Sequence, residues 1–251
     1  MGASAPFYFM IISPIKVSYV NHMGDDLTVV NAARVSFDKE SNWEKGDLLN
    51  PLSQESAVYE KCLSEQDQKL INYLAKNNHW SPFAHNSITL RIKAPIFVAR
   101  QLVKHQVGGV WNEISRRYVD TEPEFYFPDI WRGKPVNAKQ GSSDVMIPDF
   151  IIKRALEWYS YTGTEYLITE CCLKSYLELI ESGVCPEQAR MVLPQNTMTE
   201  WWWTGSLMFF NRVCKQRLDP HAQKECRDVA EQINKICEGL FPYSWEALSN
   251  S

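Results

Sequence analysis

The sequence predicts an α+β fold in a single domain. Two hydrophobic patterns support this class: apolar and polar residues alternate at 87–93, and apolar residues recur with helical spacing at Leu70, Ile71 and Leu74. Alternation is typical of a half-buried strand, and recurrence at three and four residues is typical of an amphipathic helix. A length of 251 residues allows one hydrophobic core or two, and we expect one domain over 1–251.

The first third of the chain is expected to mix the two element types. In order, we expect a strand, a helix, an irregular charged surface connection and a second helix, at 15–20, 27–34, 38–51 and 64–77. Asp25 and Asp26 stand directly before the first helix, where a carboxylate can accept hydrogen bonds from backbone N–H groups of the first turn. This part therefore predicts sheet and helix together from the start.

The middle of the chain is expected to join a strand, a helix and an extended segment. The strand at 87–93 is followed by a proline that suits a first helical turn, and the helix is expected to run from 96 to about 106. The glycine pair at 108–109 should end it. An extended segment is expected at 111–119.

The second half is expected to be mainly helical. Residues 131–148 are rich in Gly, Ser, Pro and Asn and predict a surface loop insertion. The helical stretches expected after it lie at 150–182, 186–192, 205–216 and 220–239. Each is bounded by glycine or proline, the residues that most often interrupt or end a helix.

The charge balance argues against nucleic acid or an anionic membrane as a partner. With 26 Lys and Arg against 30 Asp and Glu, the formal net charge is −4. A bound phosphate group must therefore be held by a local cluster of cations. The apolar fraction of 45% and the charged fraction of 22% are those of an ordinary globular protein.

The cysteines and the N-terminus bear on the cellular compartment. Seven cysteines are scattered without CxxC spacing, which argues against both a disulfide framework and a zinc site. Residues 5–12 are apolar, but no basic residue precedes them and no small-residue cleavage site follows. We therefore expect an N-terminal extension at 1–14, free thiols and a cytoplasmic protein, or a host-cytoplasmic one if the source is viral.

The densest polar cluster joins the middle helix to the extended segment. Gln101, Lys104 and His105 can share one helical face, and the glycine pair then lets backbone N–H groups approach a ligand. An extended chain would next turn Ser115 and Arg117 to one side, where they could bind a phosphate. The alternative is a solvated polar face whose charges pair with one another. The residues alone leave both interpretations open.

At this cluster the sequence resembles the flavin-dependent thymidylate synthases. Their usual motif is Arg-His-Arg, seven residues and then Ser, within a longer Asn-Glu-x-Ser-x-Arg-Tyr. Here the tail at 112–118 agrees throughout, whereas the triplet is Lys-His-Gln at 104–106 and eight residues, 107–114, precede Ser115. The chain thus departs from the motif by two substitutions and one insertion.

Further blocks carry the same resemblance in family order. They lie at 26–27 with 32–36, and at 79–85, 94–101 and 189–194, followed by Arg217 and by 221–223. The resemblance therefore spans nearly the whole chain. It leaves out the first dozen residues and the loop at 131–148.

The resemblance implies a fold, a reaction and an assembly. It implies mixed helices and antiparallel sheet, and the reductive methylation of deoxyuridylate (dUMP) to thymidylate (dTMP). Methylenetetrahydrofolate donates the carbon, NADPH is the reductant, and both act through bound FAD. The active sites lie at subunit interfaces of a homotetramer. No cysteine attacks the pyrimidine, and none here lies beside a histidine or in a Pro-Cys-His context.

The resemblance assigns one set of residues to dUMP. It comprises Gln101, Lys104, Glu113, Ser115, Arg117, Arg190 and Arg217. Ser115, Arg117 and Arg190 suit the phosphate, because arginine offers a bidentate fork. Arg217 matches the catalytic residue beside the uracil ring, a cation that stabilises the N3-deprotonated base and makes C5 more nucleophilic. The alternative for Arg217 is an arginine that neutralises the dipole at a helix C-terminus.

A second set is assigned to FAD. It comprises His79, Ser81, Lys104, His105, Gln106 and Glu113. Lys104 keeps a cation without the planar fork of arginine, and Gln106 has no charge, so the flavin contacts are expected to be weakened or rearranged. Ser206, Met208 and Arg212 occupy positions where some members have polar flavin contacts, and those roles are not carried over.

Two other features have a structural alternative to a ligand-binding role. His79 and His85 lie six residues apart with no carboxylate between them, which is poor spacing for a metal, so no metal site is expected. Trp201, Trp202 and Trp203 are expected to pack in the core or in a subunit interface.

Two other functions stay open at this point. The altered triplet at 104–106 motivates a related flavin- or nucleotide-binding oxidoreductase that consumes NADPH without making thymidylate. A non-catalytic assembly protein that keeps the fold without the cofactor is the other. Bound FAD and dUMP-dependent tritium release distinguish all three.

Overall fold

The computed structural model describes residues 10–48, 59–136, 141–143, 145–148 and 167–251. Its centre is a four-stranded antiparallel sheet in the order β2-β5-β8-β6. These strands are β2 (Lys16–Met23), β5 (Ser87–Pro95), β8 (Met198–Gly205) and β6 (Gly109–Glu113). The predicted class, α+β with an antiparallel sheet, is confirmed.

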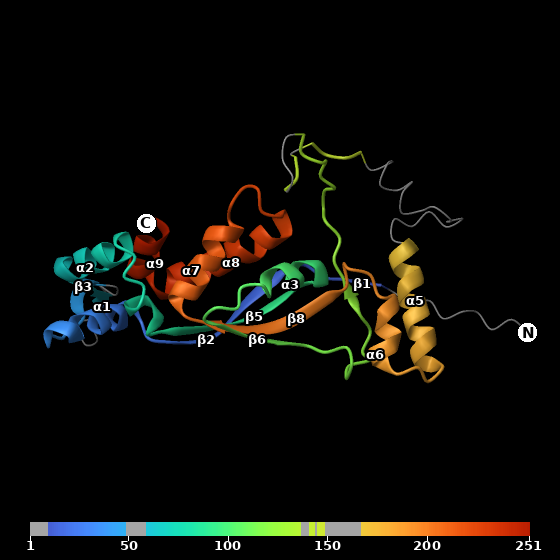
Figure 1. Ribbon diagram of the computed structural model, residues 1–251, viewed down its shortest axis with the longest axis horizontal. Coiled ribbons are helices and arrows are strands. Elements are labelled where there is room, and N and C mark those ends of the chain that lie inside the picture. Colours follow the sequence, from blue (N-terminus) through green and yellow to red (C-terminus); the bar gives the residue numbers. More distant parts are fainter. Residues whose placement is uncertain (1–9, 49–58, 137–140, 144, 149–166) are drawn as a thin grey trace, which may run out of the picture.

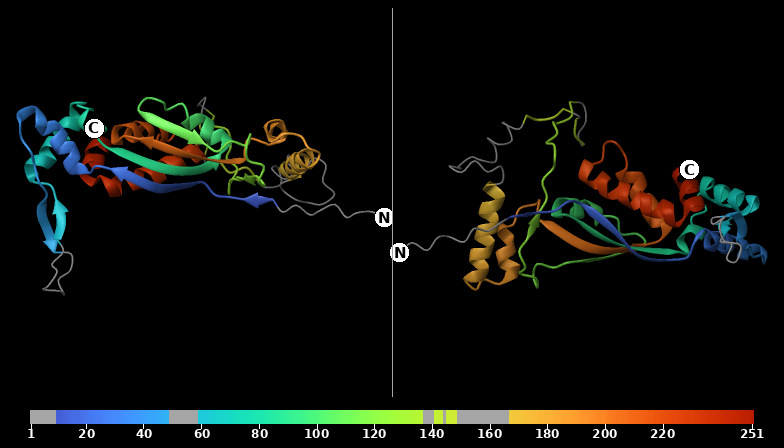
Figure 2. Two further views of the ribbon diagram at one scale, coloured as in Figure 1. Left: turned by 90° about the horizontal axis from the view of Figure 1, so that it is seen from below. Right: turned by 180° about the vertical axis from the view of Figure 1, so that it is seen from behind.

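Helices lie over one face of the sheet and beyond its two ends (Figure 1). The helices over the face are α3 (Ile96–Leu102), α7 (Leu207–Arg217) and α8 (Lys224–Leu240). One end holds α1 (Asp26–Arg34), α2 (Glu65–Lys76) and α9 (Pro242–Ser249), and the other α5 (Leu167–Glu181) and α6 (Pro186–Ala189). Short 3₁₀ helices are η1 (Val35–Phe37), η2 (Pro82–Ala84) and η3 (Arg190–Val192). Seen from below, the strands lie in front of the helices that cover the sheet (Figure 2).

Two small strand pairs accompany the main sheet. The strands β1 (Ile11–Ile12) and β7 (Glu124–Phe125) pair in parallel, which ties part of the expected N-terminal extension to the body. The strands β3 (Glu44–Leu48) and β4 (Tyr59–Cys62) pair antiparallel. The expectation of an irregular connection at 38–51 was therefore wrong for 44–48.

Side-chain hydrogen bonds cap the N-termini of α1 and α2. Asp25 accepts a hydrogen bond from the backbone N–H of Thr28 at 2.9 Å, while its own N–H donates to the Thr28 hydroxyl at 3.1 Å. Ser64 accepts from the N–H of Asp67 at 3.2 Å at the start of α2. Each side chain satisfies a backbone donor that a helix leaves unpaired. The predicted cap before the first helix is confirmed.

The central strand β8 was not predicted. It pairs with β5 on one side and β6 on the other. Trp201 and Trp203 are buried on the face that the helices cover, and Trp202 is half exposed on the other face. The expectation of core packing is therefore right for two of the three tryptophans, and the strand's alternation explains the third.

Several element boundaries also differ from expectation. Helix α3 ends at Leu102 rather than near 106, and β6 ends at Glu113 rather than 119. The chain continues after α8 into the unpredicted α9. The helical stretch expected from 150 is described only from 167, and residues 149–166 lie outside the described part. The insertion at 131–148 stays a prediction; its described residues include one bridge, between Arg132 and Met146.

A glycine pair lets α7 approach the sheet closely. Gly109 and Gly205 face each other across β6 and β8, and the Phe209 ring lies over both, so that a Cβ at either position would penetrate the ring. Phe209 is buried, with its ring 5.2 Å from that of Trp203 and 5.1 Å from that of Phe210 between centroids. This packing holds the first turn of α7 against two strands at once.

One hydrophobic core joins the sheet to the covering helices and to α1, α2 and α9. Its continuity agrees with the predicted single domain. Within the described ranges, no helix combines the length and the apolar character that crossing a bilayer requires.

The glycine packing predicts opposite effects for two alanine substitutions. Gly205→Ala should lower the free energy of unfolding by about 1–3 kcal/mol, because the added methyl group overpacks the site against Phe209. Gly239→Ala, in α8 where nothing lies within 4 Å of the added Cβ, should raise it by about 0.5–1 kcal/mol. Urea denaturation of both variants measures this. Equal losses of stability in the two variants would contradict the role given to the contact of Phe209 with Gly109 and Gly205.

Candidate functional site

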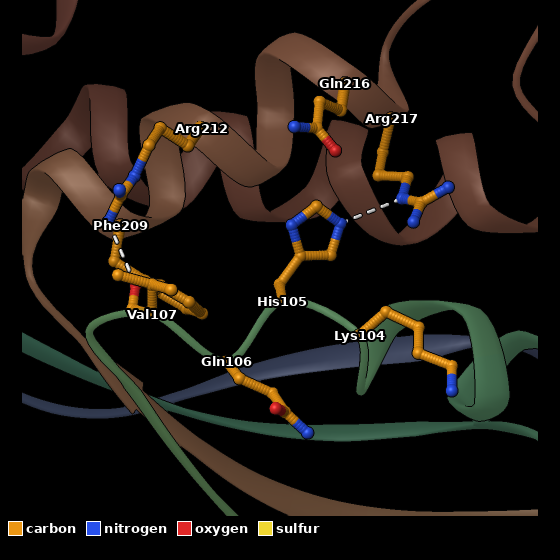
Figure 3. Close-up of a pocket in the computed structure, with 8 residues that line it drawn as sticks. All are labelled: Lys104, His105, Gln106, Val107, Phe209, Arg212, Gln216 and Arg217. Atoms are coloured by element: carbon orange, nitrogen blue, oxygen red, sulfur yellow. Dashed lines mark hydrogen bonds between the residues drawn. The ribbon is translucent and has the colours of Figure 1, made fainter.

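Three cavities follow one side of α7. The first, of about 250 Å³, lies between residues 104–107 and α7 (Figure 3). The second, of about 600 Å³, lies between α7, the end of α2 and η2. The third, of about 640 Å³, lies at the C-terminal end of α7. The first shares residues of α7 with each of the others, so the three adjoin one another along that helix. Together we call them the groove.

Arg217 lies at the junction of the first and third cavities. Its Nε donates a hydrogen bond to Nε2 of His105 at 3.0 Å, as Figure 3 shows. Its Nη2 donates to the carbonyl oxygen of Gln101 at 3.2 Å. Both acceptors belong to the segment after β5 and not to α7, so these bonds orient the guanidinium toward the cavities. A guanidinium has five N–H groups, which leaves donors for a ligand.

His105 is held neutral beside two arginines. Its Nε2 accepts from Arg217, so the ring proton belongs on Nδ1. Burial, and then the charges of Arg217 and Arg212, lower the pKa of His105 below its ordinary value. The imidazole also lies edge-on to the Trp203 ring, with 6.4 Å between centroids. His105 therefore orients Arg217 without adding a competing charge.

The segment between α3 and β6 is shaped by its glycine pair and by α7. Gly108 has a φ of +84°, which favours glycine, and Gly109 is needed for the Phe209 packing described above. Nη2 of Arg212 donates to the carbonyl oxygen of Val107 at 2.9 Å. Gly108 thus supports a turn, and Gly109 has a packing role that the sequence pattern did not indicate.

The second cavity is largely apolar with cations at its edge. Phe83 and Met208 contribute apolar surface, and Arg212 and Lys215 supply positive charge. His79 also lines this cavity. Ser81 lies in the same turn, between two lining residues, but does not line the cavity itself.

The structure brings together five of the predicted site residues around the first and third cavities. They are Gln101, Lys104, His105, Gln106 and Arg217. Lys104, His105 and Gln106 were expected at the end of a helix, but they follow it, because α3 ends at Leu102. The turn that follows still brings both Lys104 and His105 to the first cavity, and His105 points toward α7 (Figure 3).

Four other predicted residues lie outside these cavities. Glu113 accepts a hydrogen bond from the Thr199 hydroxyl at 2.7 Å. Nε of Arg117 donates to the Ser115 hydroxyl at 3.2 Å, and the segment that carries them runs on from β6 toward the α5–α6 end (Figure 1). Arg190 opens η3 and is exposed. One chain therefore does not assemble the whole predicted dUMP set around Arg217.

Sequence reasoning gave no role to several residues that line the groove. They are Arg212, Lys215, Gln216 and Gln223. The first three stand at helical spacing on one face of α7. Helical periodicity could have grouped them with Arg217. Gln223 follows α7 by a loop, so only its place in a family block pointed to it.

One thiol, that of Cys226, lies beside a predicted site residue, Gln101. All seven cysteines are free. Sγ of Cys226 lies 3.4 Å from Oε1 of Gln101 and donates to it, and burial raises the pKa of the Cys226 thiol to about 11. This thiol therefore stays protonated at neutral pH, whereas attack needs the thiolate. In the described part of the chain, no three His, Cys, Asp or Glu side chains gather as metal ligands would.

Comparison with known proteins places this chain among enzymes of one kind. The family described as thymidylate synthase complementing protein (Thy1) matches residues 18–243. A flavin-dependent thymidylate synthase of Thermosipho africanus is 36% identical over 229 residues, which cover 91% of this chain and 88% of that protein. One from Thermus thermophilus is 34% identical over 244 residues, which cover 96% of this chain and 78% of that protein.

A solved structure resembles the whole fold. The UMP/dUMP methylase PolB from Streptomyces cacaoi, bound with 5-Br dUMP, superimposes with a TM-score of 0.73. It shares 29% sequence identity, and the match covers 96% of this chain and 97% of that chain.

The pairing of His105 with Arg217 predicts a measurable titration. With five histidines in the chain, labelled histidine NMR can follow each one, and His105 should titrate below the ordinary value. Arg217→Gln should move the pKa of His105 upward by removing the adjacent cation, Arg212→Gln should do so less, and Arg190→Gln not at all. An unchanged pKa in Arg217→Gln would refute the pairing.

The lowered pKa of His105 also makes the stability of the folded protein depend on pH. The pKa of folded His105 lies below the unfolded value of about 6.5, so its contribution to stability is present above that value. It is lost as the pH falls through the folded-state pKa. Arg217→Gln should weaken this acid dependence in denaturation measured across that range.

Proposed function

This chain belongs to the flavin-dependent thymidylate synthase family, and we propose that it methylates dUMP to dTMP in the groove along α7. The observation that carries the proposal is the position of Arg217, oriented by His105 and by the Gln101 carbonyl at the junction of two cavities. PolB, whose structure holds 5-Br dUMP, supports dUMP as the substrate.

Arg217 acts on the pyrimidine as a fixed cation. It stabilises the negative charge that develops when N3 of uracil loses its proton, and the charge spread over the ring makes C5 a better nucleophile. The two hydrogen bonds to the protein hold the guanidinium in place before the substrate arrives, so little reorganisation is needed. The protonated Cys226 thiol supports a reaction without a cysteine nucleophile.

The described residues fit a flavin nucleotide, which we take to be FAD. The second cavity offers apolar surface for an aromatic ring system, and cations at its edge and in the first cavity offer hydrogen bonds to a pyrophosphate. His79, Lys104 and His105 would hold it, with Ser81, Gln106 and Glu113 as further expected contacts. When bound and reduced, the flavin supplies the electrons for the methylation.

NADPH and methylenetetrahydrofolate are the proposed co-substrates, as reductant and carbon donor. The adjoining cavities give room for more than one ligand along α7. The cytoplasmic location stays a prediction.

We further propose that the active site is completed by a second subunit in a homotetramer. Glu113, Ser115, Arg117 and Arg190 are exposed or half-buried and lie outside the cavities that Arg217 lines. An arginine pair and a hydroxyl suit the phosphate of dUMP. Their separation from Arg217 within one chain supports a site that is shared between subunits.

The reaction is tested by tritium release from [5-³H]dUMP in the presence of FAD, NADPH and methylenetetrahydrofolate. Release that requires all four ligands supports the proposal. A protein that binds FAD and oxidises NADPH but releases no tritium would be the alternative oxidoreductase. A colourless protein that takes up no FAD would be the alternative assembly protein.

Two substitutions should divide turnover from flavin binding. Arg217→Ala should lower the rate of tritium release by about 10²–10³-fold, by analogy with the loss of one oriented transition-state donor. It should leave FAD occupancy, read from the visible spectrum, nearly unchanged. Lys104→Ala should instead lower FAD occupancy, because it removes a cation from the first cavity. Equal loss of FAD in both variants would contradict this division of roles.

A shared site predicts that two inactive variants restore each other. Arg190→Ala and Arg217→Ala should each be inactive alone. Co-expressed in equal amounts, they should regain roughly a quarter of the wild-type rate, since one site in four would draw both arginines from intact subunits. Light scattering gives the oligomeric state of the mixture. No recovery in a mixed tetramer would refute the sharing of these two residues.

A further inference from the structure

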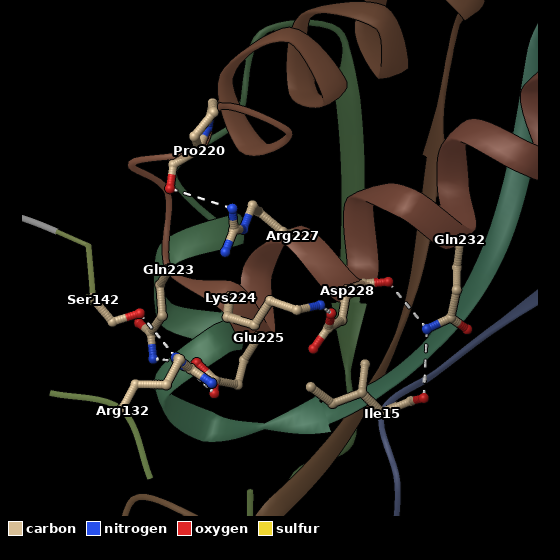
Figure 4. A network of polar contacts seen from close by, with 10 residues as sticks. All are labelled: Ile15, Arg132, Ser142, Pro220, Gln223, Lys224, Glu225, Arg227, Asp228 and Gln232. Atoms are coloured by element: carbon tan, nitrogen blue, oxygen red, sulfur yellow. Dashed lines mark hydrogen bonds and ion pairs between the residues drawn. The ribbon is translucent and has the colours of Figure 1, made fainter. Parts of the chain in front are cut away.

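A polar chain links the loop that follows β7 to the substrate groove. Arg132 donates from Nη2 to Oε1 of Glu225 at 2.6 Å and from Nε to the Ser142 hydroxyl at 2.8 Å (Figure 4). Glu225 lies in the first turn of α8, and its side chain is only 5% exposed. The Arg132 side chain is 26% exposed, but removing it would leave the buried Glu225 carboxylate without its cation, which is costly. The ion pair therefore fixes the loop against the start of α8.

Glu225 sets the direction of the next hydrogen bonds. Burial raises the pKa of its carboxyl group, but hydrogen bonds from Arg132 and Gln223 outweigh burial and hold that pKa below its ordinary value. The group is therefore an ionised carboxylate, which only accepts hydrogen bonds. The Gln223 amide must turn its NH₂ toward it, and Nε2 donates to Oε2 at 3.0 Å (Figure 4).

The orientation of the Gln223 amide in turn determines the orientation of the Gln101 amide. With its NH₂ on Glu225, Gln223 faces Gln101 with its carbonyl oxygen, and Nε2 of Gln101 donates to that oxygen. The Cys226 thiol then donates to Oε1 of Gln101 at 3.4 Å. Each donor and acceptor along the chain agrees with the one before it. The orientation of the Gln101 amide thus follows from the charge of Glu225.

Gln101 and Gln223 both line the third cavity, as does Arg217. The loop supplies a wall of this cavity through Gly141, whose φ is +84° and whose added Cβ would come within 3.0 Å of the His221 carbonyl oxygen. Gly141 belongs to the stretch that the family resemblance leaves out. The anchored loop therefore shapes the cavity next to the catalytic arginine.

We propose that Arg132 and Glu225 are positioning residues for the pyrimidine nucleotide: through Gln223 they fix the direction in which the Gln101 amide meets dUMP. This rests on the proposed function, since it takes Gln101 to contact dUMP. Neither Arg132 nor Glu225 touches the substrate. They act by removing the alternative, flipped amide orientation.

The test is the nearly isosteric Glu225→Gln in the full-length, FAD-loaded protein. The new amide places an NH₂ against Arg132 or against Gln223, and a flip of Gln223 and then Gln101 relieves the clash of donors. The Kd for dUMP should rise about tenfold, the scale of one misdirected hydrogen bond. The Kd for FAD should change less than twofold. Isothermal titration calorimetry and flavin fluorescence measure the two constants.

A double-mutant cycle separates positioning from a general structural effect. In a Gln101→Ala background, Glu225→Gln should have no further effect on the Kd for dUMP, because the amide through which it acts is gone. Glu231→Gln, an exposed glutamate on the same helix, is the matched control and should change neither constant. If Glu225→Gln weakens dUMP binding equally with and without Gln101, the proposal is overturned.

Arg132→Gln is a second route to the same result if Glu225→Gln does not fold, as judged by its Tm. It should weaken dUMP binding in the same direction and lose that effect in the Gln101→Ala background. Suppose that the wild-type protein binds dUMP and releases tritium, and that the variants bind dUMP equally well. This result would overturn the positioning role and leave the proposed function intact. Wild-type protein that binds no dUMP would overturn the proposed function with it.

Discussion

The packing of Phe209 on the Gly109–Gly205 pair is the constraint on which the site depends. A side chain at either glycine would push α7 away from the sheet, since the ring already fills the space. Because the helix lies so close, its two arginines reach the turn at 104–108 and hydrogen-bond to it. Residues that touch no ligand thus determine where the cations of the groove stand. Gly109 beside the motif contributes through this contact, and its neighbour Gly108 contributes through its backbone conformation.

The groove concentrates positive charge in a protein whose net charge is negative. A protein of net charge −4 attracts an anionic nucleotide only where it concentrates cations. Helix α7 does so with Arg212, Lys215 and Arg217, and it carries no acidic residue. Those arginines help to lower the pKa of His105, so the residue that orients Arg217 stays a neutral acceptor. Most of the positive charge comes from α7, and the turn that faces it adds Lys104 and orients Arg217 through His105.

The limits of sequence prediction are clear when β5 and β8 are compared. The sequence of β5 alternates cleanly and was predicted, because its apolar side chains are buried while Arg91 and Lys93 on the other face stay at least partly exposed. In β8, three consecutive tryptophans hide the same alternation, since the half-exposed Trp202 is as apolar as its buried neighbours. The β3–β4 pair was missed for the opposite reason, because its strands are too polar to show a buried face. Hydrophobic period and composition predict an element only when its buried residues are apolar and its exposed residues are polar.

The site itself depends on pairs that no local pattern contains. His105 meets Arg217 across 112 positions and Gln101 meets Gln223 across 122, whereas spacing rules reach only neighbours within one helix or strand. Resemblance supplied the residue types but not these partners. It also marked Gln106 as a lost cation, yet Arg212 lines the same cavity from the opposite wall. A bound anion responds to the charge that surrounds it and not to the motif position that supplies the charge, so the substitution at 106 need not empty the groove of its attraction.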